Sequence, residues 1–132
     1  MKNLSNLWGP LHILLGGFMT MFKPGQIMCH KLFHYRGVIL KVDEAFKLTN
    51  EWYDLMAKSK PPKDKPWYHI IVDNKTHMTY VAERNLQPDH SSKNITHPLM
   101  TIYFTEIIDG IYQRNLNWEG DVPVPVGNIG SA

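Results

Sequence analysis

The stretch "PWYHIIVDNKTHMTYVAERNL", residues 66–86, decides the fold of this chain. Two runs in it, 68–72 and 77–81, are dense in aromatic and β-branched residues, which favour a pleated, half-buried sheet surface over a helix. The link between them, 73–76, is polar and begins with Asp and Asn, whose side chains bond to the nearby backbone and tolerate left-handed conformations. The stretch therefore predicts a β-hairpin.

Further strands are predicted on both sides of this hairpin. A turn at 23–26 leads into the run 27–30, and Gly37 precedes the apolar run 38–42. After the hairpin, 83–86 either extends the second strand or forms a short strand of its own. Strands therefore dominate the predicted fold.

Two short helices are also expected. Over 49–57, Thr49 or Asn50 can cap the first turn, and apolar residues recur at positions i, i+3 and i+4. Over 97–108, "HPLMTIYFTEII", Pro98 occupies a suitable first helical position and apolar residues lie on more than one face. The second helix is expected to pack against the strands.

With 132 residues, the chain has the length of one small domain with tails, and such a domain can bury a substantial core. We divide it into an apolar leader at 1–21, a domain at 22–109 that ends with the second helix, and an irregular tail at 110–132. The tail is rich in Gly, Pro and Val at its end and shows no periodicity.

The leader has more than one interpretation. Residues 7–22, "LWGPLHILLGGFMTMF", contain no charged residue and follow a lysine near the start, as in a signal sequence. However, the run is shorter than the roughly 20 apolar residues that span a bilayer, is broken by glycines and a proline, and lacks a small-x-small cleavage site. It is a secretory signal or anchor, an apolar segment packed on the domain, or a poorly ordered leader.

The compartment consequently stays open between secretory or membrane-anchored and cytoplasmic or nuclear. Any contact with a membrane would run through residues 7–22. The sequons that start at Asn3, Asn74 and Asn94 matter only if the chain enters the secretory pathway.

The chain is only mildly basic. Its formal net charge is +2 and its isoelectric point is near 8.7, below the value of about 9 that marks dedicated nucleic-acid-binding domains. Positive charge is clustered in the segment 58–66, where prolines hold the chain extended. This segment is either a solvated loop or a loop that contacts phosphate groups. Its lysines are Lys58, Lys60, Lys63 and Lys65, and further cations that could join them are Lys23, Lys31, Arg36 and Lys41.

Catalytic and metal sites are not indicated. The single cysteine, Cys29, excludes an internal disulfide and a cysteine-rich zinc site. His30 and His34 flank a strand end and a loop, so their spacing lacks the geometric meaning it has on a helix. No nucleophile elbow, phosphate-binding glycine loop or dinucleotide fingerprint occurs. We expect a non-enzymatic protein without metal or cofactor.

Several segments, in their order and spacing, resemble the hemimethylated DNA-binding, or YccV/HspQ-like, domain family. They are "FKPGQIMCHKLFHYRGVILKVD" at 22–43, Trp52, "PWYHIIV" at 66–72 and "TYVAERNL" at 79–86. The later stretch "HPLMTIYFTEIIDGIYQRN" is similar to the tail of animal members, including one at the C-terminus of an F-box only protein. The resemblance implies a mainly all-β fold, a small SH3-like β-barrel with a short helical insertion and a C-terminal helix or tail.

The resemblance implies DNA as the partner, and it leaves a protein-binding adaptor in proteolysis, linked to a protease or a ubiquitin ligase, as the alternative. A purely structural domain in a larger or membrane-anchored assembly is a third hypothesis. The oligomeric state is not indicated. Cations would contact phosphates, aromatic side chains could hold a peptide, and His69 is either a packed histidine or a ligand contact. The candidate binding residues are Lys58, Lys60, Lys63, Lys65, Trp67, Tyr68, His69, Tyr80 and Arg36.

Overall fold

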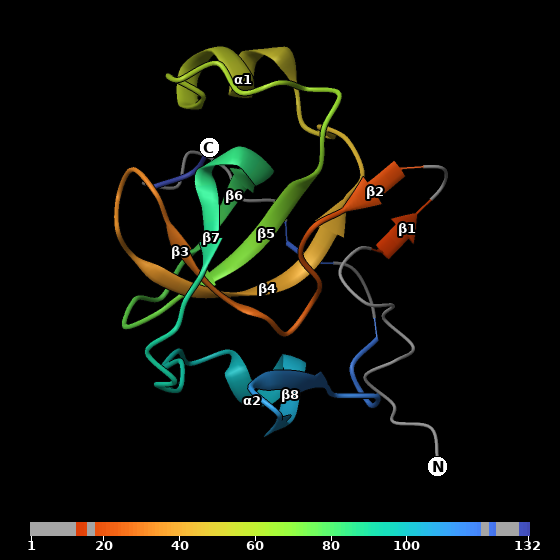
Figure 1. Cartoon of the computed structure of the whole chain (residues 1–132), viewed down its shortest axis with the longest axis vertical. Helices are drawn as coiled ribbons and strands as arrows, with labels where there is room; N and C mark the ends of the chain where they lie inside the picture. Colours follow the sequence, from red (N-terminus) through yellow and green to blue (C-terminus); the bar gives the residue numbers. More distant parts are fainter. Residues whose placement is uncertain (1–12, 16–17, 120–121, 124–129) are drawn as a thin grey trace.

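The computed structural model describes residues 13–15, 18–119, 122–123 and 130–132. Figure 1 shows strands in the middle of the molecule, with α1 at one end and α2 with β8 at the other. The elements in chain order are β1 (Ile13–Leu15), β2 (Phe18–Thr20), β3 (Ile27–His30), β4 (Arg36–Asp43), α1 (Asn50–Met56), β5 (Trp67–Val72), β6 (Met78–Ala82), the 3-10 helix η2 (Glu83–Asn85), β7 (Leu86–Pro88), α2 (Met100–Tyr103), β8 (Phe104–Ile108) and β9 (Ile111–Arg114).

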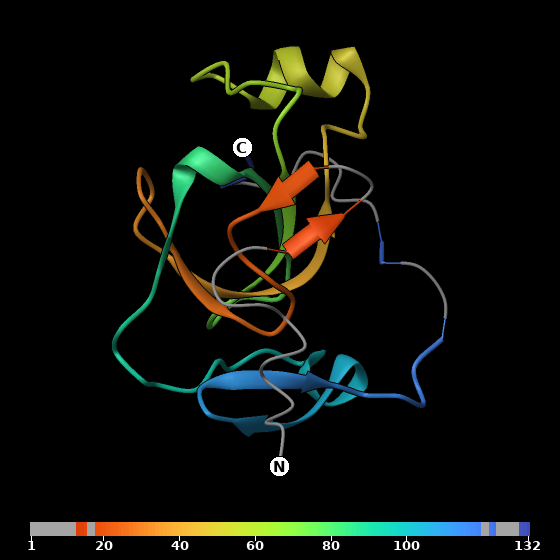
Figure 2. The same ribbon diagram turned by 45° about the vertical axis from the view of Figure 1, so that its right-hand side comes forward.

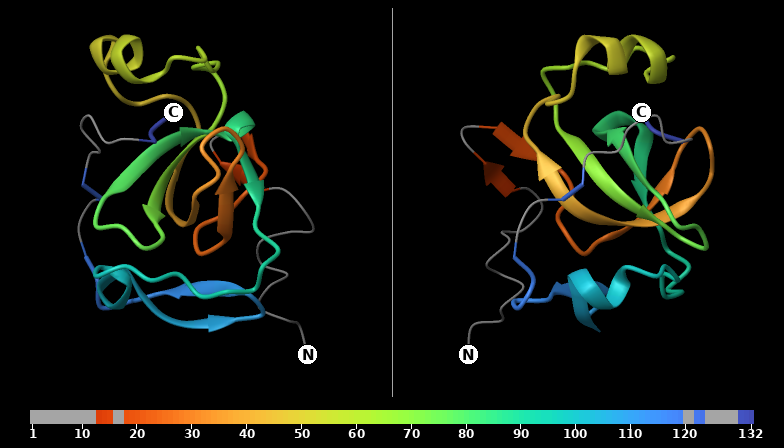
Figure 3. Two further views of the ribbon diagram at one scale, coloured as in Figure 1. Left: turned by 90° about the vertical axis from the view of Figure 1, so that its left-hand side faces the viewer. Right: turned by 180° about the vertical axis from the view of Figure 1, so that it is seen from behind.

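The central element is an antiparallel sheet. Within the described residues it has five strands in the order β6-β5-β4-β3-β7, so the prediction of a mainly β fold is confirmed. The sheet curls, as Figure 3 shows from two sides, but its edge strands β6 and β7 are joined through η2 and are not paired with each other. The predicted barrel is therefore an open, curled sheet.

The hairpin predicted within residues 66–86 is confirmed. β5 and β6 pair in a register that places His69 opposite Tyr80. The turn between them passes through Asn74, whose φ of 61° lies in the left-handed region that asparagine tolerates. Residues 83–86 divide between η2 and the start of β7, so they do not extend β6.

Both faces of the hairpin are buried, although its composition predicted a half-buried surface. Every residue of β5 and β6 is buried. Tyr68, Ile70 and Val81 belong to one apolar cluster, whereas Ile71 and Met78 belong to a second cluster that includes residues from the C-terminal part of the chain. Successive strand residues point to opposite faces, so covering layers on both sides remove the alternation of polar and apolar residues.

The first predicted helix is confirmed as α1. The side chain of Thr49 accepts a hydrogen bond from the backbone N–H of Trp52 at 3.1 Å, which is the N-cap interaction that the sequence suggested. Trp52 is the buried residue of the helix and packs with Trp67 and Tyr80. α1 thus covers one end of the sheet (Figure 1).

The second predicted helix, over 97–108, is wrong for most of its length. Only Met100–Tyr103 is helical, and Phe104–Ile108 forms β8, which pairs with β9. The cause is the turn that follows: Asp109 and Gly110 have φ angles of 51° and 79°, the pair of positive values that a two-residue hairpin turn requires. Figure 2 shows this blue hairpin beneath the central sheet.

The expectation of an irregular tail at 110–132 also needs correction. Its first residues form β9, and its last described residues, Ser131 and Ala132, are buried against β6. In the predicted leader, β1 and β2 pair with each other, while residues 1–12 and 16–17 lie outside the described part. None of the helices in the described part has the length and apolar character that crossing a membrane requires. Whether the leader is a signal, an anchor or a packed segment stays a prediction.

Candidate nucleic-acid interface

The basic segment 58–66 is a loop held between α1 and η2. The backbone N–H of Glu83 donates to the carbonyl of Pro66 at 3.0 Å, and the guanidinium of Arg84 donates to the carbonyl of Ser59. The indole N–H of Trp67 donates to the carbonyl of Pro62 at 3.1 Å. The loop is thereby fixed at both ends and near its centre.

All four lysines of this loop are exposed, but they differ in what they contact. The Nζ of Lys63 donates to Asn50 Oδ1 at 2.8 Å and lies 4.3 Å from the ring centre of Tyr53. The Nζ of Lys60 lies 3.8 Å from a carboxylate oxygen of Asp54. Lys60 and Lys63 therefore direct their charge toward α1. Within the described part of the chain, Lys58 and Lys65 form no ion pair.

A groove of about 500 Å³ adjoins the loop. Among the described residues that line it, three are cationic and one is acidic, and most of the rest are apolar. The cations come from three segments: Lys31 from the β3–β4 turn, Lys65 from the loop and Arg84 from η2, and all three are exposed. The described lining residues are Met21, Phe22, Lys31, Pro62, Lys65, Ala82, Glu83, Arg84, Leu86, Gln87 and Pro88.

The carboxylate among the described lining residues, Glu83, is engaged by the protein. Glu83 Oε2 accepts hydrogen bonds from the hydroxyl of Tyr68 and from the backbone N–H of Met21, the latter at 3.0 Å. Burial and the neighbouring Glu83 carboxylate raise the pKa of Tyr68, so its hydroxyl keeps the proton that it donates. These hydrogen bonds hold the Glu83 carboxylate in place without cancelling its charge, so the described lining carries three cationic side chains and one acidic side chain.

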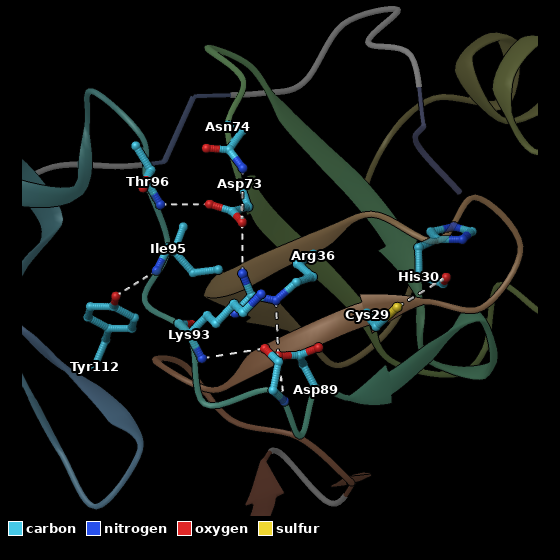
Figure 4. Close-up of polar contacts among 11 residues, drawn as sticks. Cys29, His30, Arg36, Asp73, Asn74, Asp89, Lys93, Ile95, Thr96 and Tyr112 are labelled. Atoms are coloured by element: carbon cyan, nitrogen blue, oxygen red, sulfur yellow. Dashed lines mark hydrogen bonds and ion pairs between the residues drawn. The ribbon is translucent and has the colours of Figure 1, made fainter.

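Arg36, a predicted binding residue, has a structural role. Its guanidinium pairs with Asp73 at 2.8 Å and with Asp89 at 3.0 Å, and its side chain is 19% exposed (Figure 4). Burial raises the pKa of Asp89, but hydrogen bonds from Ser91 and Arg36 outweigh it and hold this pKa below its usual value. Arg36 thus ties the start of β4 to two distant turns and does not extend the basic surface.

The expectation that Trp67, Tyr68 and Tyr80 could present a surface to a partner is contradicted by their burial. All three side chains are fully enclosed, and His69 is 4% exposed. The rings of Trp67 and Tyr80 are stacked at 5.2 Å, beneath α1. The physical reason is that both faces of the sheet are covered. Their contribution to the groove is indirect, because Trp67 anchors the basic loop and Tyr68 anchors Glu83.

His69 belongs to a buried polar network. Asp43 Oδ2 accepts a hydrogen bond from the Tyr80 hydroxyl at 2.7 Å and lies 3.2 Å from His69 Nε2. Burial raises the pKa of Asp43, but the hydrogen bonds from His69 and Tyr80 outweigh this and lower it. With Asp43 7% exposed and His69 4% exposed, a substrate does not reach this pair, so the network is structural.

Metal ligation finds no support in the part of the chain that the structure describes, since no group of three or more His, Cys, Asp or Glu side chains there is placed to hold an ion. Cys29 is a half-buried free thiol whose Sγ lies 3.7 Å from the carbonyl of His30.

Sequence reasoning missed Arg84 as a groove residue and named Lys31 only as an additional cation. Arg84 follows the oppositely charged Glu83 in a stretch for which the sequence predicts a strand, and its position depends on η2 contacting the loop at Ser59. Lys31 reaches the same place because its backbone N–H donates to the carbonyl of Asn85 at 2.8 Å. The only local signal for Lys31 and Arg84 as groove residues was the positive charge of each side chain.

Comparison with known proteins gives one family. The family model described as "Hemimethylated DNA-binding protein YccV like" matches residues 20–110, which is well over half of the chain and contains the central sheet, the basic loop and the groove. No solved structure matches the chain. The match extends the region on which the sequence resemblance rested through α2 and β8. The chain therefore belongs to the YccV-like family of hemimethylated DNA-binding proteins.

Proposed function

We propose that this protein binds duplex DNA at the groove beside the basic loop and that it is not an enzyme. The observation that carries the proposal is the convergence of Lys31, Lys65 and Arg84 from three separate segments around a single groove. Exposed lysine and arginine side chains neutralise DNA phosphates, and this supplies most of the affinity for DNA that does not depend on sequence. Family membership supports the same ligand.

A methyl group on a base would be recognised by the apolar part of the groove. Met21, which is 54% exposed, and Pro88, which is also exposed, lie among the cations. Apolar side chains contact methyl groups that project into a DNA groove, while cations on both sides hold the backbone. This arrangement would let one surface combine phosphate contacts with methyl readout.

The test is fluorescence anisotropy with one duplex sequence in unmethylated, hemimethylated and fully methylated forms, measured over a series of salt concentrations. We expect weak binding, with Kd around micromolar near physiological salt, because the number of cations is small. The variant Lys31→Ala/Lys65→Ala/Arg84→Ala should bind every duplex more weakly, and its salt slope should be shallower by about one unit per lost contact.

A matched control removes the same charge elsewhere. Lys47, Lys75 and Lys93 are exposed and lie outside the groove lining. Lys47→Ala/Lys75→Ala/Lys93→Ala should leave the salt slope close to that of the unmodified protein. Equal loss of binding in the two triple variants would show that net charge alone is responsible and would remove the groove from the proposal.

The loop lysines allow a second comparison. Lys58 and Lys65 should contribute most of the loop's part in DNA binding, because all four lysines are exposed but these two form no ion pair among the described residues. Lys60→Ala/Lys63→Ala should have a smaller effect on the salt slope than Lys58→Ala/Lys65→Ala, since Lys60 and Lys63 already contact Asp54 and Asn50.

The adaptor role in proteolysis and the animal-type character of the tail stay secondary hypotheses. If no duplex binds even at low salt, the DNA function is wrong and the adaptor hypothesis takes its place. A preference for the hemimethylated duplex that is lost in Met21→Ser would support methyl readout by the groove.

A further inference from the structure

The turn between β3 and β4, residues 31–35, holds two large apolar side chains in solvent. Leu32 is 52% exposed and Phe33 is 56% exposed. Figure 1 shows this turn as an orange loop that projects from the central sheet. Adjacent exposed apolar side chains mark contacts with other molecules more often than scattered single ones do. The turn is therefore a candidate contact surface.

A buried histidine holds this turn in one conformation. The ring of His30 accepts hydrogen bonds at Nδ1 from the backbone N–H groups of Leu32 and Phe33, both at 3.1 Å. The carbonyl of His30 accepts from the N–H of His34, and the carbonyl of Tyr35 accepts from the N–H of His30, both at 2.9 Å. The ring of Phe33 also stacks on that of His30, with ring centres 4.6 Å apart. An ordered turn thus presents the exposed side chains, which reduces the loss of conformational entropy on binding.

The turn adjoins the groove proposed for DNA. Its first residue, Lys31, lines the groove, and the backbone N–H of Lys31 donates to the carbonyl of Asn85 at 2.8 Å. Asn85 ends η2, the element that contributes Arg84 to the groove. Leu32 and Phe33 directly follow Lys31 in the chain, so a phosphate contact at Lys31 would bring both side chains to the surface of the duplex.

We propose that Leu32 and Phe33 form an apolar wedge that inserts between two base pairs of the duplex held at the groove. The wedge rests on the DNA function proposed above and adds a contact with the bases to the contacts with phosphates. Phe and Leu are among the side chains that DNA-binding proteins insert at a base step, which partly unstacks the step and kinks the duplex. Burial of the two exposed side chains and the adjacent cations offset the cost of unstacking.

The charge around the wedge favours DNA as its ligand. Residues 27–42 include Lys31, Arg36 and Lys41 and contain no acidic residue. A phosphate backbone on either side of the inserted side chains would therefore meet no carboxylate from this part of the chain.

A wedge also implies a preference for certain duplexes. Pyrimidine–purine steps such as TA unstack and kink easily, whereas A-tracts are stiff. The protein should therefore bind a duplex with a central TA step more tightly than a duplex of the same length with a central A-tract. This preference would arise from the deformability of the DNA and would need no hydrogen bond to a base edge.

The probe is a hemimethylated duplex with a central TA step in which 2-aminopurine replaces the adenine. Unstacking raises the fluorescence of this base, so the unmodified chain at saturation should increase it. Leu32→Ser/Phe33→Ser should abolish the increase and should bind the duplex roughly fivefold more weakly. Its salt slope should not change, because every cation of the groove is retained.

The matched control removes an apolar side chain elsewhere. Leu55, in α1, is 63% exposed and lies outside the described groove lining. Leu55→Ser should bind the duplex and raise the fluorescence as the unmodified chain does. Lys31→Ala/Lys65→Ala/Arg84→Ala gives the complementary result, since loss of phosphate contacts makes the salt slope shallower.

Near-ultraviolet circular dichroism of the packed tryptophans shows whether the double serine variant is folded. Should it fail to fold, Leu32→Ser alone supplies the test, because it leaves the stacking of Phe33 on His30 in place. This single variant should give a smaller rise in fluorescence than the unmodified chain.

Failure of the wedge can be told apart from failure of the DNA function. If the unmodified chain binds the duplex without raising the 2-aminopurine fluorescence, or if the folded serine variant raises it equally, the wedge is wrong and the DNA function stands. If no duplex binds even at low salt, both proposals are wrong. Binding to anionic phosphatidylserine vesicles in place of DNA would then assign the turn to a membrane surface.

Discussion

At the scale of single residues, the protonation of His30 is coupled to folding. Its buried ring accepts hydrogen bonds at Nδ1 from the backbone N–H groups of Leu32 and Phe33, both at 3.1 Å, and stacks on the ring of Phe33 at 4.6 Å. Accepting at Nδ1 requires that this nitrogen carries no proton. Burial first, and the neighbouring His34 second, lower the pKa of His30 from 6.5 to about 4.

This shift predicts a loss of stability on mild acidification. Between pH 6.5 and 4 the unfolded chain binds a proton at His30 that the folded chain does not, so the free energy of unfolding falls as the pH falls, by roughly 2 kcal/mol over this window. Urea unfolding at pH 7, 6, 5 and 4 measures it. His30→Gln should be less stable at pH 7 but should lose less between pH 7 and 4.

His97, whose pKa is also lowered by burial, adds the same sign of pH dependence to both proteins and so cancels in this comparison. If the free energy of unfolding fell equally with pH in the unmodified chain and in His30→Gln, the loss of stability could not be assigned to His30.

Residue-level prediction succeeded for exposure of the loop lysines, because charged side chains stay in water whatever the fold. It failed where the outcome depended on partners far along the chain. Arg36 looked available, but its carboxylate partners lie 37 and 53 residues away. Tyr80 looked like a surface aromatic residue, but α1 and residues 130–132 cover it. No local pattern reveals such coverage.

At the scale of elements, the β8–β9 hairpin shows which sequence signals compete. Pro98 and the apolar residues after it favoured a helix, yet the pair Asp109-Gly110 between two β-rich runs is the stronger indicator, because it meets the demand of a tight hairpin for two positive φ angles. By contrast, the cap at Thr49 and the turn at Asn74 were predictable, since each depends on chemistry within a few residues.

Gly25 joins this hairpin to the central sheet. Its backbone N–H donates to the carbonyl of Ile39 at 2.7 Å, and its carbonyl accepts from the N–H of Tyr112 at 2.8 Å. Its φ is 89°, and a Cβ atom there would lie 2.1 Å from the carbonyl oxygen of Tyr112. The position therefore demands glycine for two reasons, backbone conformation and the close approach of β9.

Gly25→Ala should lower the free energy of unfolding by more than about 2 kcal/mol, since the left-handed strain alone costs roughly 1 kcal/mol and the hairpin must also move away. Gly110→Ala is the matched control: its φ is 79° but a Cβ atom there meets nothing within 4 Å, so only the conformational cost of about 1 kcal/mol applies. Chemical denaturation compares them. An equal loss of unfolding free energy in the two variants would show that β9 moves away from residue 25 without a measurable cost.

At the scale of the whole molecule, the sequence predicted a mainly β domain with strands in the right places, because strand and turn signals are local. It could not predict that the sheet remains open or that residues 130–132 lie in the opening, since Gly, Ser and Ala carry no local signal for that location. The groove could not be predicted either, because η2, the basic loop and the β3–β4 turn come together only in the folded chain.

The groove and the two described sequons lie at opposite ends of β5. Glu83 bonds to Pro66 just before this strand, whereas Asn74 follows its end and donates its backbone N–H to the carbonyl of Thr96 at 2.8 Å, in the second sequon. Six strand residues span about 20 Å. Asn74 and Asn94 are exposed, so a glycan at either position would fit the fold and would leave the groove free.

The glycosylation state consequently reports on the compartment independently of the fold. DNA binding requires a compartment that holds DNA, and N-glycosylation requires passage through the secretory pathway. We expect protein isolated from its own cells to carry no glycan at Asn74 or Asn94, so glycosidase treatment should leave its intact mass and its gel mobility unchanged. The same chain placed behind a cleavable secretion signal is the positive control, and it should gain glycans that Asn74→Gln/Asn94→Gln removes. A glycan on the native protein would assign the leader to targeting and would make the DNA function untenable, whatever affinity the groove shows in solution.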